Sequence, residues 1–107
     1  MLRLMVNWDR ITELQEEVGE DDLAEVLQLF CEEVEEALSA LSTTDAETLK
    51  GHLHFLKGSA LNIGLDQVST LCREAEQTLA SNPQSNILVE AIRSAYQSAR
   101  VELKDLF

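Results

Sequence analysis

The chain has 107 residues, of which 45% are apolar, and carries a formal net charge of −12. A chain of this length builds one hydrophobic core, so we expect a single domain over residues 1–107. The negative charge argues against nucleic acids and anionic membranes as partners, because both are negatively charged themselves. No apolar run approaches the roughly 18 residues of a membrane span, and the N-terminal MLRLMV is too short for a signal peptide.

The first two predicted helices follow from capping residues and apolar spacing. Asn7 is a good N-cap, and the helix that follows it should end near Gly19. The next helix, over residues 21–41, has apolar residues at intervals of three and four, with acidic residues opposite. Those acids, expected to form a solvated surface, are Glu32, Glu33, Glu35 and Glu36. Leu29 falls off the apolar stripe and either docks a partner or lies beneath the first helix; we favour burial.

The third helix is expected to begin at a capping box formed by Thr44 and Glu47. It extends to about Gly64, and a fourth helix follows almost at once, over residues 65–79. Both helices repeat apolar residues at helical spacing. The repeats are Leu49, Leu53, Leu56, Ala60 and Ile63 in the third helix, and Leu65, Val68, Cys72, Ala75 and Leu79 in the fourth.

The fifth helix is expected to begin at Asn82 and Pro83, which suit the N-cap and the first helical position, and to reach Leu106. No segment alternates with the period of a strand, and the connections are only a few residues long. Amphipathic helices joined by short connections pack antiparallel. The predicted fold is therefore all-α, an antiparallel up-down four-helix bundle with a short N-terminal capping helix.

Neither the cysteines nor the histidines are spaced like metal ligands. Cys31 and Cys72 lie far apart within helical patterns, and we expect buried free thiols, which favours a cytoplasmic protein. His52 and His54 are two residues apart, so on a helix they point about 160° away from each other. They cannot share a metal ion, and we expect no metal site.

The two histidines occupy different positions on the third helix. With about 100° per residue, His54 lies about 140° from the centre of the apolar stripe and faces solvent. His52 lies only about 60° from that centre, at the edge of the core, where we expect no chemistry. Lys50, Lys57 and Leu61 fall on the same side as His54.

The surroundings of His54 suit a phosphoryl group. Residues 48–64 contain two lysines and no acid, in a chain with 20 acids, which predicts a positive patch for an anionic group or for the acidic pocket of a partner. Lys57 can reach the same ligand as His54, and Gly58 removes a side chain beside it, at a cost of about 1 kcal/mol of helix stability. Imidazole is a nucleophile near neutral pH, and its attack on a phosphoryl group gives a phosphoramidate whose oxygens Lys57 could neutralise.

The run HFLKGSALNIG resembles the signature of histidine phosphotransfer (HPt) domains, which is roughly H-x-L-K-G-[SA]-[SA], then a glycine and a helix containing a cysteine. The matching residues are His54, Leu56, Lys57, Gly58, Ser59, Ala60, Gly64 and Cys72. The stretch NWDRITELQEEVGEDDLAEVLQLF is also similar to the family's N-terminal region. The resemblance implies a four-helix bundle that shuttles a phosphoryl group between receiver-domain aspartates in a multistep phosphorelay.

Carried over residue by residue, the resemblance makes His54 the phospho-acceptor, through its outward Nε2, with Lys57 and Gly58 in support. Family members often place a Gln or Glu on the next helix to orient the imidazole, and Gln67 and Glu76 are both candidates here. The residues expected at the partner surface are Lys50, Leu61, Gln67 and Glu76. The partners implied are receiver domains of response regulators and hybrid histidine kinases, which also supply Mg²⁺.

The chain lacks an ATP-binding glycine-rich loop, a kinase motif and a receiver-type acidic cluster, so we expect a monomeric phosphocarrier without a cofactor of its own rather than an enzyme. One alternative is a helical adaptor that keeps the fold without being phosphorylated and that binds receiver or kinase domains. Another is a dimerising histidine kinase domain without its ATPase half. The chain begins with Met and ends soon after the last predicted helix. Both features fit a free-standing protein, although a domain of a hybrid kinase would look similar.

Overall fold

The computed structural model describes residues 5–42, 45–83, 87 and 89–106. In these ranges it contains five α-helices, a short 3-10 helix and no strand, so the prediction of an all-α chain is confirmed. None of the described helices is long and apolar enough to cross a membrane. The helices are α1 (Trp8–Val18), α2 (Glu20–Ala40), α3 (Ala46–Asn62), α4 (Asp66–Ser81) and α5 (Val89–Leu103), followed by η1 (Lys104–Leu106).

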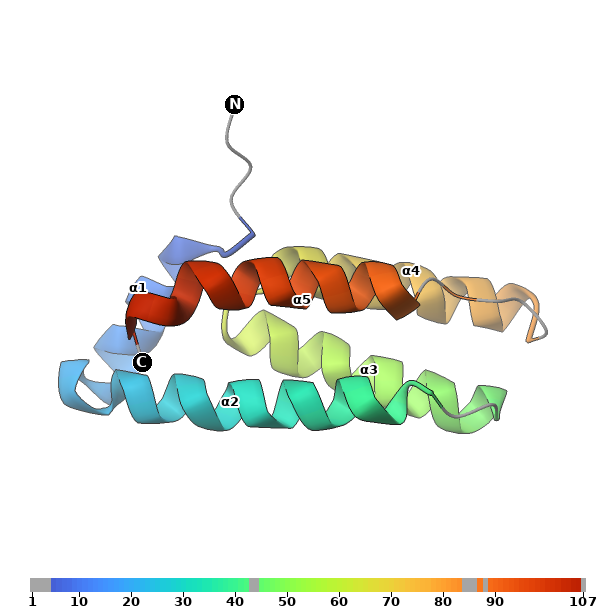
Figure 1. Ribbon diagram of the computed structural model, residues 1–107, viewed down its shortest axis with the longest axis horizontal. Helices are drawn as coiled ribbons and strands as arrows, with labels where there is room; N and C mark the ends of the chain where they lie inside the picture. Colours follow the sequence, from blue (N-terminus) through green and yellow to red (C-terminus); the bar gives the residue numbers. More distant parts are fainter. Residues whose placement is uncertain (1–4, 43–44, 84–86, 88, 107) are drawn as a thin grey trace, which may run out of the picture.

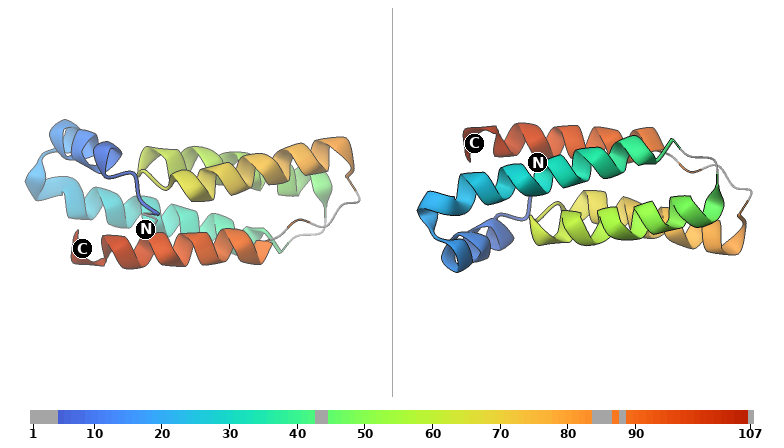
Figure 2. Two further views of the ribbon diagram at one scale, coloured as in Figure 1. Left: turned by 90° about the horizontal axis from the view of Figure 1, so that it is seen from above. Right: turned by 90° about the horizontal axis from the view of Figure 1, so that it is seen from below.

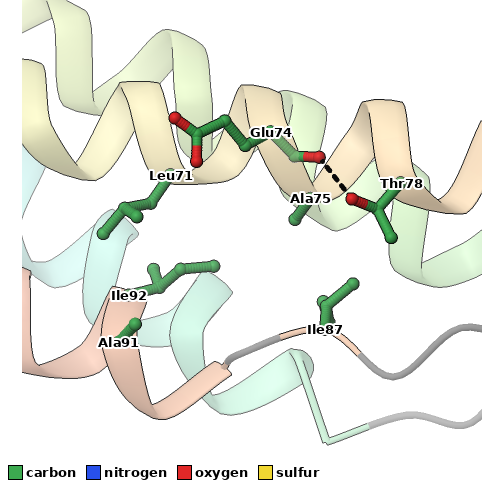
Figure 3. A pocket seen from close by; sticks show the side chains of 7 residues that line it. All are labelled: Leu71, Glu74, Ala75, Thr78, Ile87, Ala91 and Ile92. Carbon is green, nitrogen blue, oxygen red and sulfur yellow. Dashed lines mark hydrogen bonds between the residues drawn. The ribbon is translucent and has the colours of Figure 1, made fainter.

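Helices α2 to α5 lie side by side along the long axis of the molecule, and α1 crosses one end of them (Figures 1 and 2). Each of these four helices runs opposite to the one before it. The closest packing is that of α3 against α4, and α2 packs on α3 as well. On the side of α4 that faces α5, a groove with apolar walls opens between Leu71 and Ile92 (Figure 3).

The apolar stripes predicted from the sequence form the core. The apolar stripe predicted for residues 21–41 consists of Leu23, Leu27, Phe30, Val34, Ala37 and Leu41. Of all the stripe residues only Phe30 is not fully buried, and it packs half-buried against the core. Small side chains allow α3 and α4 to approach, because Ser59, Ala60 and Ser69 are all buried. On the other side, α5 is tied to α2 by Tyr96, whose hydroxyl donates to Glu35 Oε2 at 2.6 Å. Glu35 therefore accepts a hydrogen bond that links α2 to α5, in addition to being part of the acidic face.

The predicted start of the fifth helix is wrong. Asn82 ends α4 instead: its backbone is extended (φ −150°, ψ 99°), and its N–H donates to the Thr78 carbonyl at 2.9 Å. A residue before proline is pushed away from helical geometry, so Asn82 suits the end of one helix as well as the start of another. Helix α5 begins only at Val89.

The capping predictions at the other helices have different outcomes. Asn7 caps α1 as predicted, its side chain accepting from the Arg10 N–H, and Gly19 ends that helix. Thr44, half of the predicted capping box, lies outside the described residues. The N-cap of α3 is Asp45.

The expectation that Leu29 lies beneath α1 is wrong, because this residue is 54% exposed. Leu27, two residues earlier, is fully buried in the core. Residues two apart point about 160° away from each other on a helix. Burying Leu27 therefore turns Leu29 outward, and α1 does not reach over it.

The turn between α3 and α4 is fastened to the start of α1. The Asn7 N–H donates to the Gly64 carbonyl at 2.7 Å, and the Arg10 Nε donates to the Asn62 carbonyl at 3.0 Å. Gly64 has φ +75°, and a Cβ added there would lie 2.7 Å from the Asn7 carbonyl oxygen. This position therefore requires glycine both for its backbone conformation and for the space.

Replacing Gly64 with alanine should lower the free energy of unfolding by at least about 2 kcal/mol, since left-handed backbone alone costs about 1–2 kcal/mol for an L-residue. The midpoint of thermal unfolding, followed by circular dichroism, should fall by roughly 10 °C. The matched control is Gly58→Ala, where an added Cβ meets nothing within 4 Å. That variant should be stabilised by about 1 kcal/mol. A Gly64→Ala protein as stable as the parent would contradict this role of the turn.

Candidate functional site

His54 stands on the outer face of α3 with 74% of its side chain exposed. The nearby Leu53 and Leu56 are fully buried, so the helix places the imidazole outside and these two leucines inside. This is the orientation that the helical spacing predicts. His52 is half-buried and lines a groove between α2 and α3, at the edge of the core as expected.

Glu76 of α4 joins His54 and Lys57 into one cluster. Its Oε2 lies 3.5 Å from His54 Nδ1, and its Oε1 lies 2.9 Å from Lys57 Nζ. The Glu76 and Lys57 side chains are only 22% and 26% exposed. Within the described residues, the buried Oε1 has no hydrogen-bond partner apart from this ammonium group. Lys57 therefore holds the carboxylate in place, and the carboxylate faces the imidazole.

This arrangement distinguishes the two nitrogens of the His54 ring. A carboxylate facing Nδ1 favours the tautomer in which Nδ1 carries the proton. In that tautomer Nε2 has a free electron pair. Because the Nδ1 edge faces Glu76, Nε2 is the nitrogen available to an incoming partner.

Of the two candidates to orient the imidazole, the structure brings only Glu76 to His54. Gln67 is nine residues earlier on α4, which turns it about 180° away from Glu76 around the helix axis. It is half-buried beside Met5 and lines a different groove, together with Ala95 of α5. Gln67 therefore lies on the wrong side of α4 to touch His54.

The positive patch predicted for residues 48–64 is weaker than the sequence indicates. Lys57 pairs with Glu76, and Lys50 Nζ lies 3.3 Å from Glu47 Oε1. Both acids lie outside the stretch, Glu47 just before it and Glu76 on the next helix. The lysines are consequently neutralised in part by neighbours that a linear count does not include.

Exposed apolar side chains lie near His54. Leu61 is 51% exposed, as its helical position predicts. Phe55 is 52% exposed, which the sequence analysis missed although its angle of about 100° from His54 places it outside the buried stripe. Gly58 is exposed, with open space where a Cβ would stand. The surface around the imidazole is thus partly apolar and open.

Cys72 lies buried one turn before Glu76 on α4. Burial in the core raises the pKa of its thiol to about 12, so the thiol stays protonated at neutral pH. A buried, protonated thiol is a poor nucleophile, which leaves the chemistry of this region to His54. Both cysteines are free and buried, as predicted. Among the described residues, no group of three or more side chains could hold a metal ion.

Comparisons with known proteins identify the family of this chain. The family model described as Hpt domain matches residues 25–106, which include the whole His54–Lys57–Glu76 cluster. Histidine-containing phosphotransfer protein 2 of Arabidopsis thaliana is 27% identical over 111 residues, an alignment that covers 92% of this chain and 71% of the relative. No solved structure matches the chain. On the match to its family model, the chain belongs to the Hpt domain family.

Proposed function

We propose that this chain is a histidine phosphotransfer protein, which accepts a phosphoryl group on His54 from a receiver-domain aspartate and passes it to another receiver. The observation that carries the proposal is an exposed imidazole whose Nδ1 faces a carboxylate held by Lys57, in a chain of the Hpt domain family. In this proposal, helices α2–α5 form an antiparallel four-helix bundle and α1 caps one end of it. The protein would act as a cytoplasmic monomer and as a phosphocarrier rather than an enzyme.

In the accepting step, the free electron pair of His54 Nε2 attacks the phosphorus of the aspartyl phosphate. The N–P bond forms as the P–O bond to the aspartate breaks, and that electron pair leaves with the receiver's carboxylate. The Nδ1 proton stays on the ring, which becomes cationic. Glu76 Oε2, 3.5 Å from Nδ1, stabilises this charge. The donating step is the reverse, onto another aspartate.

Lys57 is well placed to act on the phosphoryl group. Phosphorylation brings between one and two negative charges beside His54. The Lys57 ammonium lies one helical turn from that residue, already inside the cluster, and can turn from Glu76 toward the phosphoryl oxygens. Lys57 would then stabilise both the transfer and its product.

Magnesium is placed on the receiver in this proposal. The residues around His54 do not suit the ion, because Mg²⁺ prefers several oxygen ligands. Among the residues that the structure describes, the carboxylate in contact with His54 is that of Glu76, and it is already paired with Lys57.

The exposed apolar residues offer a surface for the receiver. Phe55 and Leu61 flank His54 on α3. Leu29 shares a face of α2 with Glu33, four residues on, and Glu33 lines the same groove as Phe55. A small apolar surface suits a weak interface that dissociates quickly, as a relay needs. Leu29, unburied, becomes part of the proposed surface.

Replacing His54 with glutamine should abolish labelling by a receiver domain that carries radioactive phosphate, with helical circular dichroism unchanged. The reason is that the amide has no nucleophilic nitrogen. The matched control is His52→Gln, which should be labelled like the parent protein. Label retained by His54→Gln and lost by His52→Gln would move the site to His52. No labelling of the parent by any receiver would favour the adaptor.

Replacing Lys57 with alanine should slow phosphoryl transfer at least tenfold, equivalent to about 1.4 kcal/mol of transition-state stabilisation. Unfolding by urea should change less, although Glu76 Oε1 loses its partner. Lys104→Ala removes the same charge from η1, and its transfer rate in rapid-quench experiments should match the parent's. Equal rates for Lys57→Ala and the parent would remove the proposed role of the lysine.

Replacing Glu76 with glutamine should shift the neutral His54 ring away from the tautomer protonated on Nδ1, because the amide carries no negative charge. Nitrogen NMR of the imidazole, recorded at a pH where the ring is neutral, measures the tautomer ratio directly. Transfer to His54 should slow in parallel. Glu74→Gln, an equivalent change on an exposed face of the same helix, is the control. A tautomer ratio that is the same in both variants and the parent would refute orientation by Glu76.

A further inference from the structure

Two glycines flank His54 on the exposed face of α3. Gly51 comes three residues before His54 and Gly58 four residues after it. With about 100° per residue, they lie about 60° and 40° from His54 around the helix axis, on the same side. They are seven residues apart, which is about 10 Å along the helix. The imidazole therefore stands between two places where α3 has no side chain.

The protein's own packing does not require glycine at either place. A Cβ added at Gly51 or at Gly58 would meet nothing within 4 Å. Neither has a positive φ, since Gly19 and Gly64 are the described residues that do. Glycine within a helix is less favourable than alanine. Gly64, by contrast, is required by its backbone conformation and by the contact with Asn7.

Each glycine also lies beside an exposed apolar side chain. Phe55 is four residues after Gly51, and Leu61 is three residues after Gly58, so each pair forms surface neighbours on the helix. These two apolar residues are 52% and 51% exposed. The same combination of bare backbone and exposed apolar group thus occurs on both sides of His54.

We propose that Gly51 is a second approach position for the receiver domain, whose active-site rim packs on the α3 backbone on both sides of His54. This inference rests on the proposed function. Phosphoryl transfer requires the phosphorus to come within about 3–3.5 Å of Nε2, so the donor's surface lies within one side-chain length of α3. An interface of about 800 Å² on each partner, centred on His54, covers both glycines. A side chain at residue 51 would stand between the two proteins.

The test is a series at residue 51, Gly51→Ala and Gly51→Gln, with three measurements on each full-length variant. The midpoint of thermal unfolding should rise, by roughly 4 °C or more for alanine. Transfer from a phosphorylated receiver domain should slow about threefold with alanine and at least tenfold with glutamine. Labelling of His54 by phosphoramidate, a donor too small to touch residue 51, should remain at the parent's rate. If residue 51 had a purely structural role, its substitution would not raise the stability of the protein and slow transfer from the receiver at the same time.

The control is Ser94→Gln, which adds a comparable side chain to an exposed position on α5 and should leave both rates unchanged. Receiver transfer at the parent's rate in Gly51→Gln would overturn the inference and leave the proposed function standing. Parallel loss of receiver and phosphoramidate labelling would also overturn it, because the substitution would then act on His54 itself. A parent protein that phosphoramidate labels and receivers do not would reject the proposed function, and this inference with it.

Discussion

The turn at Gly64 fixes the register of α3 against α4, and this register decides which side chain of α4 lies beside His54. Only residues 63–65 separate the two helices. His54 is eight residues before the end of α3 and Glu76 ten residues after the start of α4, so they lie about 12 and 15 Å from the turn. The Leu65 N–H donates to the Ala60 carbonyl at 2.8 Å and closes the turn. A different connection would place another residue of α4 opposite the imidazole.

The charges of the cluster are balanced before any phosphoryl group arrives. Lys57 and Glu76 form a pair at 2.9 Å that is largely shielded from solvent, while His54 remains exposed. Glu76 is only partly buried, so water and Lys57 together stabilise its charge, and without Lys57 the carboxylate would be less favourable there. The pair therefore lets a carboxylate approach the imidazole in a protein whose net charge is already −12. It also keeps the Lys57 ammonium group close to His54, where the negatively charged phosphoryl group would be attached.

Helical periodicity in the sequence predicts the features that depend on one helix alone. It gives the buried stripes, the outward direction of His54 and the half-buried position of His52. It does not decide between Gln67 and Glu76, because that choice depends on the register between two helices. The pairing of Lys57 with an acid of α4 is missed for the same reason.

The remaining errors come from signals with two meanings. Asn82 before a proline suits the end of α4 and the start of α5 equally, and only the structure shows which applies. Leu29 lies outside the apolar stripe of α2, and whether it is buried depends on how far α1 extends across α2. Phe55 is apolar and exposed, and helical spacing places it outside the core without indicating that a partner could cover it. An exposed apolar residue indicates a partner surface only when it lies beside a functional site.

The most direct measurement is to map the modified residue after incubating the parent protein with a phosphorylated receiver domain and Mg²⁺. Mass spectrometry at mild pH preserves the N–P bond and locates the phosphoryl group. The proposed function predicts an acid-labile phosphoryl group on His54, and its return to an unphosphorylated receiver added afterwards. Modification of another residue, or none from any of several receivers, would contradict it.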